Sequence, residues 1–210
     1  MVFARAPERG RVKTRLAASV GDERALAIYV RLAERVTRAV ADGPWAVEIR
    51  CAPDEAAPAV AAWLGGMGAV VPQGGGDLGA RLTRAMSEHF ASRAGRVVIV
   101  GTDCPEVDAS VIRQAFAAME GADVVFGPAL DGGYYLVGCS RRAPEIFSDV
   151  PWSTPETLAV SLVRAKAAGY SVAELSPLRD IDTQEDWEAW STGAKAQLAS
   201  DDLSQRDAAC

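Results

Sequence analysis

Apolar residues recur along the chain with two spacings, one typical of helices and one typical of strands. The segment 22–41 repeats apolar side chains at helical spacing and ends at Asp42-Gly43-Pro44. The segment 96–100 ends in a continuous β-branched run, which is typical of a strand buried on both faces. Strands are predicted over 1–6, 45–51, 69–71, 96–100, 123–126, 134–137 and 172–175, and helices over 22–41, 54–64, 77–92, 108–119, 154–168 and from 183 to 190.

This alternation predicts an α/β fold in which helices cover both faces of a mostly parallel sheet. Ligands bind such sheets at the carboxyl ends of the strands, so the loops after residues 6, 71, 100, 126 and 175 carry the candidate chemistry. Because no linker or repeat divides the chain, we expect one domain over 1–190, followed by a polar helix or tail over 191–210.

Composition limits the function classes. A chain of 210 residues that is 49% hydrophobic can bury a core without disulfides. Its formal net charge of −6 argues against nonspecific binding to nucleic acid. It contains neither an apolar stretch long enough for a membrane helix nor a signal peptide, and no two cysteines have metal or redox spacing. We therefore expect a soluble cytoplasmic protein without membrane or nucleic-acid partners. The composition does not exclude a homodimer.

The loop after the first predicted strand is basic although the chain is acidic. Five of the twelve residues in 5–16 are Lys or Arg. Such side chains, together with backbone N–H groups, suit a diphosphate. The loop has neither a Walker A nor a GxGxxG pattern, and a solvated basic loop explains the charge equally well.

The loop after the third predicted strand contains Gly74-Gly75-Gly76, which allows a backbone to approach a ligand closely. Asp77 can cap the helix that follows. The two interpretations are a seat for a base or ribose and a flexible turn with a helix cap.

Asp103 follows the most strand-like segment of the chain. A carboxylate at the carboxyl end of a central strand can bind Mg²⁺ or Mn²⁺, which prefer oxygen ligands and retain phosphates and waters. A second ligand can come from Asp180-Ile181-Asp182, because helix capping does not explain both of these acids. The alternative for Asp103 is a structural carboxylate bonded to backbone N–H groups.

Two further segments suit a sugar or another small acceptor. Asp131-Gly132-Gly133 is followed by Tyr134 and Tyr135 at the same predicted edge as Asp103, although a plain turn explains the glycines too. Trp152 and Ser153 precede another helix, where Ser153 or Thr154 can serve as a cap.

Taken in order, these segments resemble the DUF2064 family over Val2 to Trp190, in FARAPERGRVKTRL, QGGGDLGARL, VIVGTDCPEV, VVFGPALDGGYYLVG, VPWSTPET and LRDIDTQEDW. Members of that family are assigned as glycosyltransferases of the GT-A superfamily and are related to the molybdenum-cofactor and 2-phospho-lactate guanylyltransferases. The resemblance implies a three-layer α/β/α, Rossmann-like nucleotide-diphospho-sugar transferase fold. Members usually begin a few residues before the first strand, whereas Met1 already lies in it here. We therefore expect either a shortened first strand or a recorded start that is late.

The resemblance also implies roles for particular residues. Asp103 and Asp182 would bind the metal. Phosphate and nucleoside would meet Arg5, Lys13, Arg15, Gly76, Asp77, Gly79 and Arg81. Donor sugar or acceptor would meet Asp131, Gly132, Gly133 and Tyr134. Trp152 and Ser153 join this set as candidates from their own loop. The resemblance identifies no catalytic base, and Asp131 is our candidate for it.

Three functions follow as hypotheses. The first is metal-dependent glycosyl transfer from a nucleotide-sugar to a small acceptor. The second is nucleotidyl transfer from an NTP to a small phosphorylated acid, which is disfavoured because Ala6-Pro7-Glu8-Arg9-Gly10 replaces the glycine-rich GGxGxRxG loop of nucleotidyltransferases. The third is a non-catalytic nucleotide-binding protein.

Overall fold

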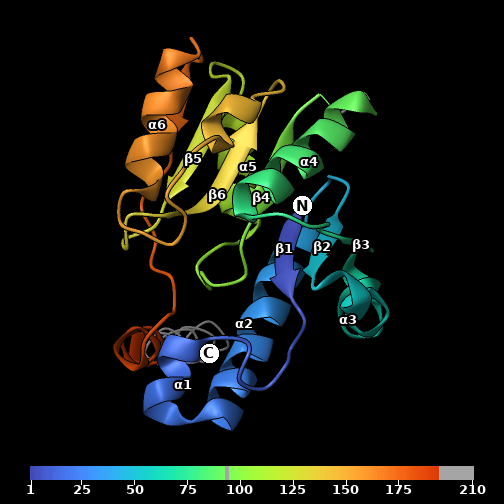
Figure 1. Ribbon diagram of the computed structural model, residues 1–210, viewed down its shortest axis with the longest axis vertical. Coiled ribbons are helices and arrows are strands. Elements are labelled where there is room, and N and C mark those ends of the chain that lie inside the picture. Colours follow the sequence, from blue (N-terminus) through green and yellow to red (C-terminus); the bar gives the residue numbers. More distant parts are fainter. Residues whose placement is uncertain (93–94, 194–210) are drawn as a thin grey trace, which may run out of the picture.

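The computed structural model describes residues 1–92 and 95–193, which form a seven-stranded sheet with helices on both faces (Figure 1). The strands lie in the order β3-β2-β1-β4-β6-β5-β7. They are β1 (Val2–Arg5), β2 (Glu48–Ala52), β3 (Ala69–Pro72), β4 (Val97–Val100), β5 (Val124–Pro128), β6 (Tyr134–Cys139) and β7 (Val172–Glu174).

The sheet is mostly parallel, as predicted, with one exception. β6 runs antiparallel to both of its neighbours, β4 and β5, whereas the other strand pairs are parallel. The carboxyl ends of β1, β4 and β5 therefore meet at one edge of the sheet. The loop 129–133, which joins β5 to β6, turns back at that same edge.

The helices are α1 (Thr14–Val20), α2 (Asp22–Ala41), α3 (Ala57–Leu64), α4 (Leu78–Ala91), α5 (Ala109–Ala118) and α6 (Thr157–Ala167), and residues 184–193 are also helical. Short 3₁₀ turns are η1 (Asp54–Ala56), η2 (Gly65–Met67) and η3 (Pro144–Phe147). The predicted Asp77 cap of α4 is present, since Asp77 Oδ1 accepts from Ala80 N at 2.8 Å. Asp108 caps α5 in a similar way, with Oδ1 accepting from Ser110 N at 2.8 Å. No helix within residues 1–92 and 95–193 is both long and apolar enough to cross a membrane.

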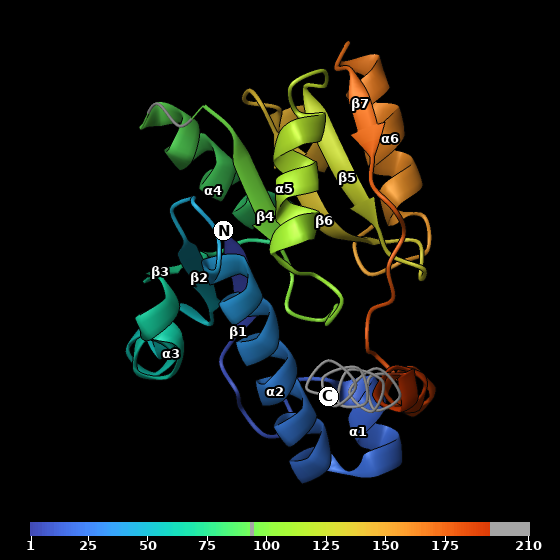
Figure 2. The same ribbon diagram turned by 180° about the vertical axis from the view of Figure 1, so that it is seen from behind.

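β4 shows why the fold has three layers. Its side chains alternate between the two faces of the sheet, and all four are buried. Val98 and Val100 pack in the cluster that contains residues of α2, α3 and α5, whereas Val97 and Ile99 pack with residues of α4 and α6. Figure 1 accordingly shows α4 and α6 in front of the sheet, and Figure 2 shows α2 and α5 on the other face.

A second, smaller assembly lies beyond the carboxyl end of β1. Leu16 of α1, Leu32 of α2 and Ile181 form a buried cluster there, against which Trp187 and Trp190 pack. Figures 1 and 2 both show α1 and the 184–193 helix lying together beyond the sheet. This assembly therefore faces the edge of the sheet at which the carboxyl ends of the parallel strands lie.

Several predicted boundaries were wrong. Helix α1 lies inside the segment predicted as a basic loop; with only one buried side chain among its seven residues, it has no apolar helical repeat. The second strand begins at Glu48 rather than residue 45, since Trp45 instead packs on Phe116 and donates to Val40 O at 2.7 Å. Helix α6 begins at Thr157, after Pro155. Most of the predicted tail, from residue 194 onwards, lies outside the described residues.

Candidate active site

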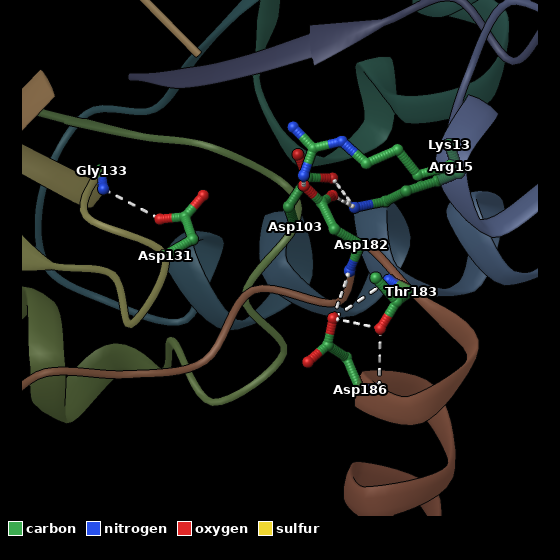
Figure 3. A network of polar contacts seen from close by, with 8 residues as sticks. All are labelled: Lys13, Arg15, Asp103, Asp131, Gly133, Asp182, Thr183 and Asp186. Atoms are coloured by element: carbon green, nitrogen blue, oxygen red, sulfur yellow. Dashed lines mark hydrogen bonds and ion pairs between the residues drawn. The ribbon is translucent and has the colours of Figure 1, made fainter. Parts of the chain in front are cut away.

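Lys13 joins two aspartates that are distant in sequence. Its Nζ lies 2.6 Å from Asp103 Oδ1 and 3.1 Å from Asp182 Oδ1 (Figure 3). Lys13 immediately precedes α1 and has a left-handed backbone, with φ 49° and ψ 46°. Only 3% of its side chain is exposed, so its ammonium group is held between the carboxylates rather than in solvent.

Asp103 occupies the predicted position at the end of β4. The strand itself is buried, but 45% of the Asp103 side chain is exposed. Its carboxylate therefore reaches both Lys13 and solvent. The prediction that β4 delivers this aspartate to the ligand edge agrees with the geometry.

Asp182 reaches the same point because its neighbours are anchored. Ile181 is fully buried, and its N–H donates to the carbonyl of Asp103 at 2.9 Å. The next helix is capped by other residues: Asp186 N donates to Thr183 Oγ1 at 3.2 Å, and Asp186 Oδ2 accepts from Thr183 N at 3.0 Å. The Asp182 carboxylate thus remains available for Lys13, and for Arg15 at 3.5 Å.

Acidic groups dominate the electrostatics of this edge. Burial alone would lower the pKa of Lys13, but the carboxylates of Asp103 and Asp182 outweigh it and raise that pKa. Burial, followed by the charges of Asp103 and Asp131, raises the pKa of Asp180 to about 7. Asp180 Oδ1 is buried without a hydrogen-bond partner among the described residues. A further cation at this edge would therefore relieve like-charge repulsion.

The donor set fits a divalent ion that keeps substrate oxygens as ligands. Within residues 1–92 and 95–193, no three or more His, Cys, Asp or Glu side chains are grouped to enclose a metal. Two carboxylates nevertheless converge on one cation, and Mg²⁺ sites commonly contain one or two carboxylates completed by waters and phosphates. Asp103 and Asp182 are the side chains that could hold such an ion.

These residues open onto a pocket of about 670 Å³. Ten of the predicted site residues line it: Arg5, Lys13, Arg15, Gly76, Asp77, Arg81, Asp103, Trp152, Ser153 and Asp182. Its other lining residues include Tyr29, Gln73, Leu78 and Thr102. A second cavity, of about 450 Å³, lies near the first residues of β1, β2 and β4 and has a mostly apolar lining that includes Met1. The larger pocket lies at the carboxyl edge, where α/β sheets bind ligands.

The glycine loop is held by two arginines of α4. Arg84 donates to Gln73 O at 2.8 Å and to Gly75 O at 2.9 Å, and Arg81 donates to Gly76 O at 2.9 Å. Gly76 has φ +100°, a conformation that side chains other than glycine rarely adopt. Helix α4 therefore holds the three-glycine segment in place, and Gly76 is the glycine of this segment that lines the pocket.

Gln73 is a pocket residue that the sequence interpretation did not single out. It is buried, and its Nε2 donates to Ala4 O at 3.2 Å and to Arg50 O at 3.0 Å. These two carbonyls fix the amide so that Oε1 accepts from Arg81 at 3.3 Å. The available signal was a polar residue within two positions of the end of a predicted parallel strand. Tyr29 is a second pocket residue that the sequence interpretation did not identify. Its hydroxyl accepts from Arg5 N and donates to Arg5 O, which joins α2 to the last residue of β1.

The predicted donor or acceptor segment lies partly outside the pocket. Asp131, Gly132, Gly133 and Tyr134 do not line it, and the Asp131 carboxylate accepts from Gly133 N at 2.9 Å (Figure 3). Gly132 has φ +92°, and its carbonyl accepts from Leu158 N at 2.9 Å. The turn interpretation therefore accounts for these glycines, and a role for Asp131 in catalysis stays a prediction.

Trp152 connects this segment to the pocket wall. Tyr134 packs between Phe126 and Trp152, with its ring centroid 5.1 Å from that of Phe126 and 6.2 Å from that of Trp152.

Gly79, another predicted site residue, also does not line the pocket. A Cβ at Gly79 would lie 2.7 Å from Phe147 O and 3.0 Å from Trp152 Nε1, so this glycine allows the Trp152 segment to approach α4.

Comparison with known proteins identifies the family. The model of the DUF2064 family, described as an uncharacterized protein conserved in bacteria, matches residues 35–154, which is more than half of the chain. The chain belongs to the DUF2064 family. No protein of curated function matches it in sequence.

Solved structures agree with this membership and with the fold. A protein of Desulfovibrio desulfuricans G20, provisionally assigned as a nucleotide-diphospho-sugar transferase, is 31% identical over 87% of this DUF2064 chain and 80% of its own, with a TM-score of 0.81. CMP:2-keto-3-deoxy-manno-octonic acid synthetase complexed with CTP is 15% identical, with coverage of 95% and 97% and a TM-score of 0.52. Rv0371c of Mycobacterium tuberculosis H37Rv, in complex with manganese, is 20% identical, with coverage of 90% and 95% and a TM-score of 0.51. The fold is thus that of the nucleotide-diphospho-sugar transferases.

Proposed function

We propose that this protein is a metal-dependent transferase that moves a glycosyl group from a nucleotide-sugar to a small acceptor. The observation that carries the proposal is the convergence of Asp103 and Asp182 on the Lys13 ammonium group, at 2.6 and 3.1 Å. Lys13, Asp103 and Asp182 line a pocket that Gly76 of the glycine loop also lines. A cation and a diphosphate held at these carboxylates would therefore adjoin a nucleoside placed on the backbone of Gly76.

The side chains divide this task between them. Asp103 and Asp182 would hold Mg²⁺ or Mn²⁺, which supplies positive charge to the departing diphosphate. Arg15 is 64% exposed beside Asp182 and can donate to phosphate oxygens from the first turn of α1. Arg5 and Arg81 line the pocket, and neither is among the ion pairs of the described residues. They can therefore bind the nucleotide without first losing a carboxylate partner.

The acceptor would approach from the side of Trp152 and Ser153. Its hydroxyl oxygen would form the new bond to the anomeric carbon, while the bond from that carbon to the diphosphate breaks and the nucleoside diphosphate leaves. The acceptor proton requires a base. In this proposal Asp131 is the base that accepts the proton, and it would act from outside the lining of the pocket.

The alternative is nucleotidyl transfer, in which an acceptor oxygen attacks the α-phosphorus of an NTP and pyrophosphate leaves. It is supported by the shared fold of the CTP-bound synthetase, which covers 95% of this chain. Both reactions use a carboxylate-bound ion beside phosphates, so they differ in the leaving group rather than in the metal site.

The leaving group therefore decides between the two reactions. The protein is incubated with Mn²⁺ and either UDP- and GDP-sugars or NTPs, with a panel of sugar and phosphorylated-acid acceptors. Release of a nucleoside diphosphate supports glycosyl transfer, and release of pyrophosphate supports nucleotidyl transfer. If neither product forms and no nucleotide binds, the proposed enzyme function is wrong.

A reducing cytoplasm is the setting that we propose. Cys51, Cys104 and Cys139 are free and buried. Burial raises the pKa of Cys104 and that of Cys139 to about 12, so neither thiol supplies a nucleophile at neutral pH. Unpaired cysteines of this kind are typical of reducing compartments.

A further inference from the structure

Lys13 forms ion pairs with the carboxylate oxygens that a metal would need as ligands. Its ammonium group pairs with Asp103 Oδ1 and Asp182 Oδ1, while Arg15 pairs with Asp182 Oδ2 at 3.5 Å. Three of the four carboxylate oxygens therefore already face a cation of the chain itself. Asp103 Oδ2 is the oxygen without an ion pair or hydrogen bond among the described residues.

A divalent ion and this ammonium group cannot occupy the site together. Mg²⁺ binds carboxylate oxygens at about 2.0–2.1 Å, so an ion shared by Asp103 and Asp182 would lie at or beside the position of Nζ. The two cations would also repel each other at this short distance. One must leave before the other can bind both aspartates.

The Lys13 ammonium group can move to a second position, because Lys13 also lines the pocket proposed to bind the nucleotide. Its main chain is fixed, since its carbonyl accepts from Ala17 N at 2.8 Å at the start of α1. The side chain, in contrast, is a compact charge on a flexible four-carbon stem. A phosphate in the pocket would give the ammonium group a new anionic partner without movement of the backbone.

We infer that Lys13 is an internal counter-ion that competes with the divalent metal, so that the diphosphate of the substrate makes metal binding favourable by drawing the lysine away. The inference rests on the proposed function and adds an order to it. Without nucleotide, Lys13 neutralises the aspartates and the ion binds weakly. With nucleotide, Lys13 moves to phosphate oxygens, and the ion takes the carboxylates. Metal and nucleotide then bind cooperatively.

Mn²⁺ titration of the protein without nucleotide tests this competition, with binding followed by electron paramagnetic resonance and calorimetry. Lys13→Met removes the competing charge and leaves two aspartates without it, so we expect its Mn²⁺ affinity to rise by about tenfold or more. Lys13→Arg keeps the charge and should bind Mn²⁺ as weakly as wild type. Arg9→Met is the matched control, since Arg9 pairs at the surface with Glu23, and it should leave the affinity unchanged.

Lys13→Gln, which also removes the charge, replaces Lys13→Met if circular dichroism shows that the methionine variant is unfolded. The same titrations with GDP and UDP present should strengthen Mn²⁺ binding to wild type more than to the uncharged variant. An unchanged or weaker Mn²⁺ affinity in the uncharged variant overturns the inference, and the proposed function survives if wild type still binds Mn²⁺ with nucleotide. Absence of Mn²⁺ binding in every variant, with and without nucleotide, overturns both.

Discussion

The backbone N–H of Ile181 donates to the backbone carbonyl of Asp103 at 2.9 Å. This single bond ties the end of the central strand β4 to a segment almost eighty positions later in the chain. Ile181 is fully buried against Leu16 and Leu32, and this packing keeps its backbone in place for the hydrogen bond. Packing of Ile181, which does not line the pocket, therefore helps Lys13 to hold the Asp103 and Asp182 carboxylates together.

Ile181→Ala should consequently affect both stability and the site. Truncation of a buried isoleucine to alanine typically costs about 2–5 kcal/mol. We expect a loss in that range by urea denaturation, together with weaker Mn²⁺-dependent nucleotide binding in the fraction that remains folded. Ile181→Val, which keeps most of the side chain, should cost about 1 kcal/mol and preserve binding. Unchanged binding in a folded Ile181→Ala protein would show that Asp182 does not need this anchor.

Arg84 is predicted to act on the nucleotide through the glycine loop. It donates to the carbonyls of Gln73 and Gly75 but does not line the pocket. Arg84→Met would release the loop, so we expect nucleotide affinity to fall about tenfold, equivalent to about 1.4 kcal/mol. The measurement is calorimetric titration with the best-binding nucleotide. Arg164→Met is the control, because Arg164 pairs at the surface with Asp149; a similar loss in both variants would contradict a specific role for Arg84.

Gly132→Ala should destabilise the turn that joins β5 to β6. Gly132 has φ +92°, and a Cβ there would lie 2.2 Å from Pro155 O, a backbone atom. We expect a loss of more than about 1 kcal/mol in the free energy of unfolding. Gly75→Ala is the matched comparison, because a Cβ at Gly75 meets nothing within 4 Å. Equal thermal stability of the two variants would argue against the tight turn.

Asp123 should give the fold a measurable pH dependence. The backbone N–H of Ser171, helped by its hydroxyl and by Arg141, outweighs burial and holds the pKa of Asp123 below the usual 3.8. A lowered pKa stabilises the folded state above pH 3.8, and this stabilisation disappears as the pH falls through the folded-state value. Asp123→Asn should thus cost about 1 kcal/mol at pH 7, and the difference from wild type should shrink below about pH 3.8 in denaturation curves. A difference independent of pH would exclude this ionic contribution.

The sequence predicted which strands and loops form the site better than it predicted the contacts between their side chains. Asp103 could be placed because four apolar residues in succession mark β4, and such a strand is central in a parallel sheet. The basic loop was recognised by charge, but helix α1 inside it was not, since most of its side chains are exposed. Charge could not reveal that Lys13 is buried between two acids, because that contact depends on a segment some 170 positions away.

Other contacts depend on tertiary geometry in the same way. Gln73 became a pocket residue only because β1 and β2 place two carbonyls beside its amide. The Asp131 segment was predicted from glycines that the structure uses for a turn and for close packing on Pro155. Glycine and aspartate support turns and ligand sites alike, so their pattern alone could not separate the two.

Thermal stability with Mn²⁺ and nucleotides tests the metal–diphosphate site most directly. The wild-type protein is melted with UDP, GDP, their sugars, GTP or CTP, each with and without Mn²⁺, alongside Asp103→Asn, Asp182→Asn and the surface control Asp149→Asn. We predict that at least one nucleotide stabilises the wild type and the control only when Mn²⁺ is present, and that both site variants lose this metal-dependent shift. A metal-dependent shift that persists in Asp103→Asn, or the absence of any shift with every nucleotide in the wild type, would contradict the proposed site.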